Sequence, residues 1–423
     1  MMILYTILAT VAAAGAILAG FVRKLFGDGH LLMRVIPPRD VPESAGKRIW
    51  IHAASMGESA IAGSLAGEIT SRNPDVLVFV SVVTKTGFER IRRSADGGGP
   101  VTRAFLAPID QPWIVAAFFD RIRPTSLILV ETELWPWLMT VAERRGVPVS
   151  VVNGKISRRG FRRYMYLRRM FRRLLGRVTH VCVQTRPYSR RFRMLGVPED
   201  RIEIIGNVKF DVLPSREDFD RDGIRRSLGV DGQARLFVAG STRPGEEAII
   251  AASYAELWRR GCRMRMVIAP RHLSRVVEIT AILDGMGLTY VRRSEGDELD
   301  LSDDGILILD TMGELIAVFA AADAAFVGGS FSDFGGHNPL EPAALGVPVL
   351  FGPYMEQTGS GELLSSGAAV LVHDESELAD ALYDIFTNNE RAQHMLETGP
   401  QVVSRFRGTL ARTVDSLEKR KAL

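Results

Sequence analysis

Three glutamates stand at places in the sequence where a carboxylate could take part in catalysis. Glu58 falls in the first helical turn after the strand-like run 48–53, and Glu131 and Glu133 follow the strand-like run 126–130. A carboxylate at such a strand end can serve as a general base, although Glu58 would equally complement the dipole of its helix. Glu131 and Glu133 lie two apart in an expected extended segment, so their side chains share a face. No histidine or third acidic ligand stands nearby in the sequence, and we predict no metal site there.

A glycine-rich segment in the second half of the chain is the most specific local pattern. Two glycines and Ser330 end a strand-like run, and residues 335–342 (GGHNPLEP) open a helix with Asn338 as N-cap and Glu341 in a capping box. Glycines permit close approach of a ligand, and a helix N-terminus attracts anions. The segment predicts a phosphate site, whereas a capped helix that binds nothing would leave the glycines unexplained. The candidate residues are Gly329, Ser330, Gly335, Gly336, His337, Asn338 and Glu341.

Two further strand ends carry polar or cationic side chains. The motif GSTRPGEE offers the hydroxyl of Thr242 and the cation Arg243, and the pair Arg271 and His272 follows another strand-like run. An arginine in such a place can form charge-assisted hydrogen bonds to a phosphate or a carboxylate. An ordinary strand-to-helix turn, whose two glutamates complement the helix dipole, is the alternative for the first motif.

The elements that must hold these residues alternate between short apolar runs and helical patterns. This alternation is typical of parallel βαβ units. It stops near 210–222, where the sequence turns polar, and then restarts. We predict two doubly wound α/β domains, with ligands at the carboxyl ends of the strands and in a cleft between the domains. The predicted strands are 48–53, 76–82, 126–130, 147–152, 178–183, 236–240, 265–269, 305–309, 324–327, 347–351 and 369–372, and the predicted helices include 60–71, 113–121, 134–144, 245–260, 274–286, 313–322, 340–345 and 375–388.

The N-terminal segment and one basic stretch point to a membrane. Residues 1–22 carry no charged side chain, which suffices for a spanning helix, and Arg23 and Lys24 follow at once. Positive residues on that side place the rest of the chain in the cytoplasm. A cleaved signal peptide is the alternative, but its basic n-region is missing. Residues 158–177 contain nine arginines among apolar side chains, a basic amphipathic pattern.

Composition and charge exclude some classes of protein. The net charge of +4 is too small to indicate binding to nucleic acid, and 46% apolar residues are ordinary for a globular chain of 423 residues. Cys182 and Cys262 lie far apart and predict neither a disulfide framework nor a metal site.

Seven motifs follow one another along nearly the whole chain after the N-terminal segment. They are HAASMGES (52–59), ETELWP (131–136), GNVKFD (206–211), GSTRPGEE (240–247), PRH (270–272), DTMGEL (310–315) and FVGGSFSDFGGHNPLEPAALGVPVLFGP (326–353). Together they resemble the Kdo (3-deoxy-D-manno-octulosonic acid) transferases of lipopolysaccharide synthesis, glycosyltransferase family 30. The last run is long enough to be specific. The chain departs from the family pattern at Arg243, where histidine is usual, and at Trp137, where asparagine is usual.

The resemblance implies a GT-B fold, in which two Rossmann-like domains face a central cleft, plus an N-terminal transmembrane helix. It implies a membrane anchor at 1–24 and an acceptor-binding domain at 35–212. A nucleotide-sugar-binding domain would follow at 222–405, and a C-terminal helix, 406–423, would pack back on the first domain.

The reaction that the resemblance implies is an inverting transfer of Kdo from CMP-Kdo to the lipid A precursor (lipid IVA) at the anionic inner-membrane surface. Glu58 would be the base, with Glu131 and Glu133 beside it, and neither a cofactor nor a metal would be needed. The donor-binding residues would be Ser241, Thr242, Arg271, His272, Met312, Gly313, Glu314, Gly329, Ser330, Gly335, Gly336, His337, Asn338 and Glu341. The residues that would bind the acceptor and the membrane surface are Arg158, Arg159, Arg162, Arg163, Arg168 and Arg169. A GT-B enzyme that uses another nucleotide sugar and a non-catalytic membrane scaffold are the alternatives.

Overall fold

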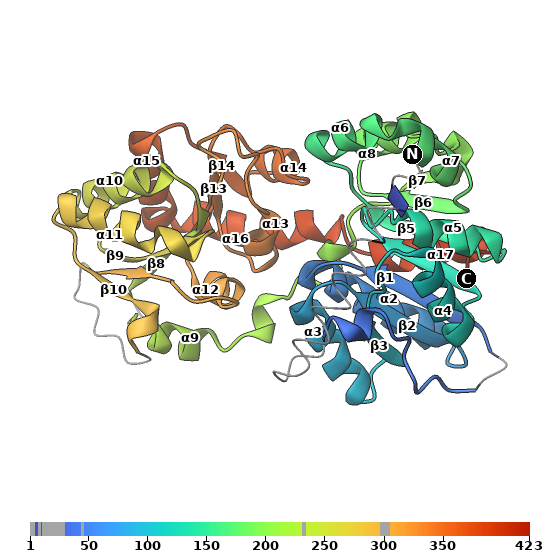
Figure 1. Cartoon of the computed structure of the whole chain (residues 1–423). Coiled ribbons are helices and arrows are strands. Elements are labelled where there is room, and N and C mark those ends of the chain that lie inside the picture. Colours follow the sequence, from blue (N-terminus) through green and yellow to red (C-terminus); the bar gives the residue numbers. More distant parts are fainter. Residues whose placement is uncertain (1–4, 7–9, 11–29, 44–45, 231–233, 297–304) are drawn as a thin grey trace. The chain divides into compact units, whose positions relative to one another are not determined.

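The computed structural model describes residues 5–6, 10, 30–43, 46–230, 234–296 and 305–423, and the chain forms two compact units. Unit 1 comprises Met1–Val212 and Arg407–Leu423, and unit 2 comprises Leu213–Phe406. Each unit contains a seven-stranded sheet whose described strands all pair in parallel (Figure 1). The prediction of an α/β chain with two parallel sheets is confirmed.

In unit 1 the first strand, β1, lies inside the sheet, and the later strands add on both sides of it. The strand order is β3-β2-β1-β4-β5-β6-β7. The strands are β1 (Arg48–Ala53), β2 (Leu77–Val82), β3 (Arg103–Leu106), β4 (Ser126–Val130), β5 (Val149–Gly154), β6 (His180–Val183) and β7 (Ile202–Ile204). The helices are α2 (Met56–Arg72), α3 (Lys85–Asp96), α4 (Pro112–Ile122), α5 (Pro136–Arg144), α6 (Arg158–Tyr166), α7 (Arg168–Leu175), α8 (Arg186–Met194) and α17 (Thr409–Lys419), with 3-10 turns η1 (Leu32–Arg34), η2 (Glu199–Arg201) and η3 (Val208–Phe210).

Both faces of this sheet are buried, which explains why its central strands are continuous apolar runs. Along β1, Trp50 packs into one core while Ile49 and Ile51 pack into another on the opposite face. The C-terminal helix α17 packs against α2 and β6, and Ser416 Oγ lies 2.6 Å from His180 Nε2 at the start of β6. The carboxyl ends of the strands remain for the loops that carry the candidate residues.

Unit 2 has a related sheet with the order β10-β11-β9-β8-β12-β13-β14, in which β11 lies between β9 and β10. Its strands are β8 (Arg235–Thr242), β9 (Met264–Pro270), β10 (Tyr290–Arg292), β11 (Ile306–Ile308), β12 (Ala324–Val327), β13 (Val349–Phe351) and β14 (Ala369–Leu371). Its helices are α9 (Arg221–Ser227), α10 (Glu246–Arg259), α11 (Val276–Gly285), α12 (Leu315–Ala321), α13 (Leu340–Ala344), α14 (Ser360–Ser365), α15 (Glu375–Thr387) and α16 (Asn389–Ser404), with 3-10 turns η4 (Arg216–Asp218), η5 (Leu273–Arg275) and η6 (Arg293–Glu295).

Each sheet has a point where the chain reverses its direction of growth, between β1 and β4 in unit 1 and between β8 and β12 in unit 2. The strands on either side of such a point send their following loops to opposite faces of the sheet. The crevice left at their carboxyl ends is the usual ligand site of a doubly wound fold. The candidate residues should therefore gather beside these two pairs of strands.

The predicted membrane anchor at 1–24 falls almost wholly outside the described residues. Within the described part of the chain, no helix is both long enough and apolar enough to cross a bilayer. The anchor and the cleft between the predicted domains stay predictions.

Candidate functional site

The three glutamates of unit 1 lie beside its reversal point. β1 and β4 are neighbours, with His52 paired to Leu129, so the loops that follow them leave the same edge of the sheet. Glu58 stands in the first turn of α2, just after β1, and Glu131 and Glu133 follow β4 directly. The sheet therefore gathers the three carboxylates that the sequence analysis selected.

Glu58 is tied to the start of α2. Its Oε2 accepts from Ala54 N at 2.7 Å, its Oε1 from Ser55 Oγ at 3.1 Å, and Ser55 Oγ accepts in turn from Glu58 N at 3.3 Å. This arrangement is related to a capping box, but the carboxylate accepts from the amide of Ala54, one residue before the N-cap Ser55. These hydrogen bonds hold the carboxylate in one orientation at the strand end, where it can also complement the helix dipole.

Glu131 adopts a left-handed conformation with φ of 56°, so the segment after β4 is a turn and not the extended chain that we expected. Its carboxylate meets Lys209 Nζ of η3 at 3.1 Å and Asn153 Nδ2 at 3.4 Å. Asn153 also accepts from Val208 N at 3.0 Å, which fastens η3 to the end of β5. Lys209 is a site residue that the sequence analysis missed, although it lies within the motif GNVKFD.

Glu133 differs from both other glutamates in its electrostatics. Burial first, and then the negative charges of Glu58 and Glu131, raise the pKa of Glu133 to about 7, although a hydrogen bond from Trp135 acts in the opposite direction. Trp135 Nε1 donates to Glu133 Oε2 at 2.8 Å, and the indole packs edge-on against the buried His52 ring at 5.2 Å. A carboxyl group that titrates near neutral pH is suited to proton transfer.

In unit 2, two arginines and two histidines gather beside the corresponding reversal point. Arg243 follows β8, Arg271 and His272 follow β9, and His337 stands in the loop after β12. Arg243 Nη1 lies 3.0 Å from His272 Nε2, and its guanidinium stacks 5.0 Å from the centre of the Phe334 ring. Burial, and then the charges of Arg243, Arg271 and His272, lower the pKa of His337 to about 4. The positive potential that depresses this pKa would favour an anion.

The glycine loop comes close to the end of β8. A Cβ on Gly328 would lie 2.5 Å from Ser241 O, and Gly329 has a φ of 73°. Both positions therefore require glycine for backbone reasons. A Cβ on Gly329 would also lie 3.2 Å from His337 Cδ2 and 3.6 Å from Arg243 Cγ, so the loop adjoins the cations.

Several backbone amides of this loop donate to groups of the protein itself, and the phosphate site stays a prediction. Gly329 N and Ser330 N donate to the carboxylate of Glu246 at 2.8 and 2.9 Å. Gly336 N donates to Gly329 O at 2.7 Å, and His337 N donates to Gly328 O at 3.0 Å. The side chains of Arg243 and Arg271 remain as candidates to bind an anion beside this loop.

The predicted helix cap also differs. α13 is only five residues long and takes Pro339 as its N-cap in place of Asn338. Asn338 Oδ1 accepts from Leu340 N at 3.1 Å, and Asn338 Nδ2 donates to Glu341 Oε1 at 3.1 Å. Asn338 and Glu341 thus stabilise the turn before the helix. The helix itself begins one residue later than the capping box predicted.

The remaining predicted donor residues lie at the same edge of the sheet. Met312 and Gly313 follow β11, and Met312 is 72% exposed. Glu314 accepts from Arg293 Nε at 3.1 Å. Thr242 is fully buried, and its Oγ1 has no hydrogen-bond partner among the described residues, so its hydroxyl lies beneath the surface. Ser241 takes a left-handed φ of 58°.

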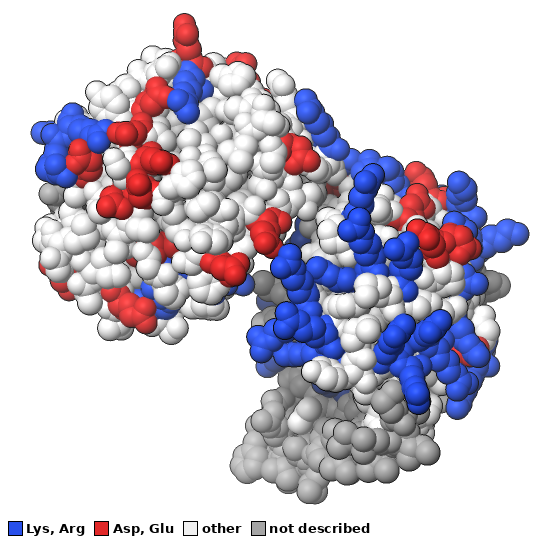
Figure 2. Space-filling model, turned by 90° about the horizontal axis from the view of Figure 1, so that it is seen from above, with Lys and Arg blue, Asp and Glu red and all other residues white. Residues whose placement is uncertain are grey.

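The arginine-rich stretch forms two helices, α6 and α7, and not one. Its nine arginines are all exposed, while Met170, Phe171, Leu174 and Leu175 anchor α7 in the core of unit 1. Figure 2 looks down on this part of unit 1 and shows Lys and Arg side chains crowded on it. Tyr166 lies among them with 85% of its surface exposed. The surface is therefore both strongly basic and partly aromatic.

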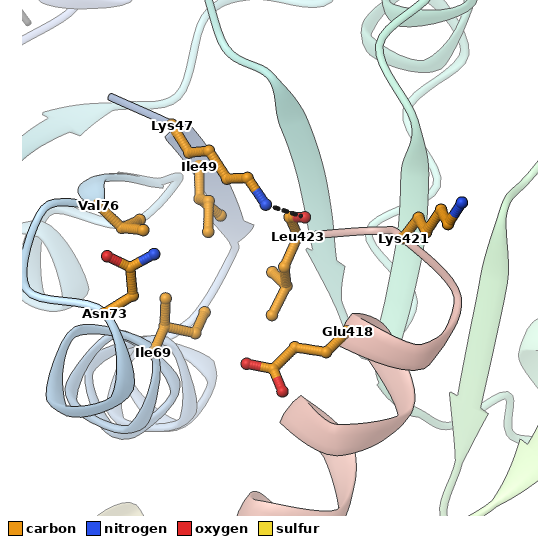
Figure 3. Close-up of a pocket in the computed structure, with 8 residues that line it drawn as sticks. All are labelled: Lys47, Ile49, Ile69, Asn73, Val76, Glu418, Lys421 and Leu423. Atoms are coloured by element: carbon orange, nitrogen blue, oxygen red, sulfur yellow. Dashed lines mark hydrogen bonds between the residues drawn. The ribbon is translucent and has the colours of Figure 1, made fainter. Parts of the chain in front are cut away.

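A pocket of about 460 Å³ in unit 1 lies elsewhere (Figure 3). Lys47 and Val76, which precede β1 and β2, line it together with Glu418 and Leu423 from the C-terminal segment. Lys47 Nζ donates to Leu423 O at 2.9 Å across its mouth. This pocket is at the amino ends of the strands, the edge opposite to the glutamates.

The fold is shared with solved structures that include a glycosyltransferase and a UDP-GlcNAc 2-epimerase. HepE from Anabaena, solved with UDP-glucose, superposes with a TM-score of 0.62 at 14% identity, covering 89% of this chain and 100% of that one. A glycosyltransferase from Rickettsia africae gives a TM-score of 0.61 at 10% identity, covering 89% and 99%. At these identities the likeness concerns the fold alone.

The sequence relatives narrow the class to one family. A family model described as 3-Deoxy-D-manno-octulosonic-acid transferase (kdotransferase) matches residues 30–212. The 3-deoxy-D-manno-octulosonic acid transferase of Bordetella pertussis is 31% identical over 384 residues, which cover 89% of this chain and 88% of that protein. The transferase of the same name from Haemophilus influenzae is 29% identical over 381 residues, covering 88% and 86%. This chain belongs to the Kdo transferase family of glycosyltransferases, and the resemblance seen in its motifs is confirmed.

Proposed function

We propose that this protein transfers Kdo from CMP-Kdo to a lipid A precursor. The observation that carries the proposal is the cluster of Arg243, Arg271, His272 and His337 at the reversal point of unit 2. In a Kdo transferase, the guanidinium groups of Arg243 and Arg271 suit the phosphate of an activated donor and the carboxylate that Kdo itself carries, and the imidazoles beside them can donate further hydrogen bonds. Arginine and histidine side chains supply this recognition without a bound metal or cofactor.

The reaction makes two demands on the protein. A proton must be removed from the acceptor hydroxyl, and the negative charge that develops on the CMP phosphate must be stabilised. A hydroxyl oxygen of the acceptor attacks the anomeric carbon, and the bond from that carbon to the CMP phosphate oxygen breaks with its electron pair. Glu58 accepts the hydroxyl proton as general base, and Glu131 and Glu133 shape the potential around it. Arg271 and its neighbours stabilise the charge that develops on the departing phosphate. Met312, Gly313, Glu314 and Glu341 contact the nucleoside in this proposal.

Mass spectrometry of lipid IVA incubated with CMP-Kdo and the purified protein tests the reaction. We expect the acceptor mass to rise by whole Kdo residues, and the number of residues added is read from the same spectrum. An unmodified acceptor under conditions in which CMP still binds would contradict the proposed transfer. Thermal-shift measurements with CMP, UDP and ADP separate the donors, and stabilisation by UDP or ADP but not CMP would favour another nucleotide sugar.

We also propose that α6 and α7 dock on the anionic inner membrane from its cytoplasmic side. All nine arginines of residues 158–177 are exposed, and an anionic bilayer contributes about 1 kcal/mol for each basic residue at its surface. Exposed Tyr166 suits the interface between lipid and water. This surface would hold the protein where an acylated acceptor resides.

Co-sedimentation with vesicles that contain anionic lipid tests the docking. Replacing Arg158, Arg162, Arg168 and Arg172 by Gln in the full chain should weaken binding and reduce its dependence on salt. The matched control replaces four exposed arginines of unit 2, Arg226, Arg259, Arg263 and Arg405, and should bind vesicles as the wild type does. Unchanged vesicle binding of the first variant would rule the docking surface out.

A further inference from the structure

Glu246 is a fully buried carboxylate at the start of α10, and its described partners are backbone N–H groups. Its Oε2 accepts from Arg243 N and Gly329 N, both at 2.8 Å. Its Oε1 accepts from Ser330 N at 2.9 Å and Phe331 N at 3.0 Å. One side chain thus joins the turn after β8 to the loop after β12, which lies 83 to 85 residues further along the chain.

A buried carboxylate is costly unless hydrogen bonds replace the water that it loses. Four N–H donors meet this requirement, and three of them come from consecutive residues of the glycine loop. Hydrogen bonds to an ionised oxygen are about twice as strong as neutral ones. The carboxylate therefore both depends on the conformation of the loop and maintains it.

The contacts of this loop link Glu246 to the anion-binding cations. The same oxygen that binds Gly329 N also binds the backbone of Arg243. Gly329 in turn adjoins the side chains of His337 and Arg243, since a Cβ there would lie 3.2 Å and 3.6 Å from them. Glu246 itself is buried and touches no open surface, so it can act on a ligand only through these residues.

We propose that Glu246 is the positioning residue of the anion site in unit 2. It fixes the loop after β12 against the turn after β8, and so fixes where Arg243 and His337 stand. The nature of the anion rests on the proposed function, but the hydrogen bonds by which Glu246 clamps the loop do not.

The neighbouring Glu247, also fully buried, binds Arg275 just beyond Arg271 and His272, with 3.1 Å between Oε2 and Nη2. The start of α10 thereby braces the strand ends on both sides of β8.

The test is the substitution Glu246→Gln in the full chain. Glutamine has the same shape, but its NH₂ group would face two N–H donors whichever way it turns, so two of the four hydrogen bonds are lost. Hydrogen exchange of residues 329–331, measured without ligand, should be slow in the wild type and faster in the variant. The Kd for CMP, measured by titration calorimetry, should rise about tenfold or more.

Glu377→Gln is the matched control. Glu377 also accepts a backbone N–H near a helix start in unit 2, from His373 N at 2.9 Å, but its side chain is 50% exposed. It should change neither the exchange of residues 329–331 nor the Kd. A purely structural role for Glu246 would lower the number of CMP sites per chain and leave the Kd of the folded fraction unaltered.

An unchanged Kd in folded E246Q, or fast exchange of residues 329–331 in the wild type, would overturn the proposal. If E246Q does not fold, Glu246→Asp keeps the charge on a side chain one methylene shorter, and the Kd should again rise. If wild-type protein does not bind CMP, the proposed donor is wrong, and the exchange rates still decide whether the loop is clamped.

Discussion

The two units have related seven-stranded sheets, each with one reversal point, but the side chains gathered at the two points differ in charge. In unit 1 the reversal point between β1 and β4 gathers Glu58, Glu131 and Glu133, and in unit 2 the reversal point between β8 and β12 gathers cations. The pKa values reflect this, since that of Glu133 is raised to about 7 and that of His337 is lowered to about 4. The fold supplies the position, and in the proposed reaction the loop residues decide whether a proton or an anion is received there.

Among the substitutions that test this contrast between the units, Glu58→Gln should cause the largest change, a loss of transfer activity. The amide can keep the cap, because its oxygen can accept from Ala54 N and its NH₂ can donate to Ser55 Oγ. Transfer should fall by about 10²–10⁴-fold, the usual contribution of a general base, while CMP binds as before. A radiometric transfer assay and calorimetry measure the two quantities. Glu68→Gln on the same helix is the control, and near-normal turnover of the Glu58 variant would exclude it as the base.

Arg271→Ala should have the next largest effect. It should weaken the binding of CMP to unit 2, whereas Glu58→Gln should lower the rate of transfer. Loss of a charge-assisted hydrogen bond to phosphate costs about 1.5–3 kcal/mol, so the Kd for CMP should rise about 10–100-fold. The control is Arg259→Ala, whose side chain is 74% exposed and paired with Glu256. If CMP binds the Arg271 variant normally, the cations of unit 2 are not the anion receptor, and the contrast between the units loses its functional meaning.

Glu133→Gln should have the smallest effect, and one that depends on pH. Because the folded pKa of about 7 lies above the ordinary value of 4.5, the stability that this carboxyl contributes is complete below about pH 4.5 and is lost as pH rises through about 7. Glutamine stays neutral, so the variant should gain about 2 kcal/mol over the wild type between pH 5 and pH 8.

Urea unfolding at a series of pH values measures this difference. Glu199→Gln, at a side chain that is 79% exposed in the same unit, should leave the wild-type pH dependence unaltered. Parallel stability curves for the Glu133 variant and the wild type would show that Glu133 is not buried among like charges.

Most strands could be predicted because their apolar runs are buried on both faces. β1, β4 and β12 match the predicted limits at both ends. The strands that were missed, β3, β7 and β10, are short and lie at or beside the sheet edges. In β7 and β10, moreover, none of the residues is buried, so a continuous apolar pattern is absent.

The candidate site was predictable in its residues but less so in its contacts. The carboxylates and cations follow strands that could be recognised, and doubly wound sheets bring such residues to one edge. Lys209 was missed because its partner Glu131 lies far from it in the sequence. The left-handed turn at Glu131 was missed because non-glycine residues seldom adopt that conformation.

The α/β class, most strands and the sheet edge that carries the candidate residues thus follow from local patterns, since hydrophobic periodicity and turn residues act over a few neighbouring positions. The proposed positioning role of Glu246 does not follow from these local patterns. In the sequence it is one of two glutamates at a helix start, where the helix dipole alone explains it. Only the folded chain brings it to the amides of Gly329 and Ser330, because a hydrogen bond depends on ångström-scale geometry between groups that the sequence holds far apart.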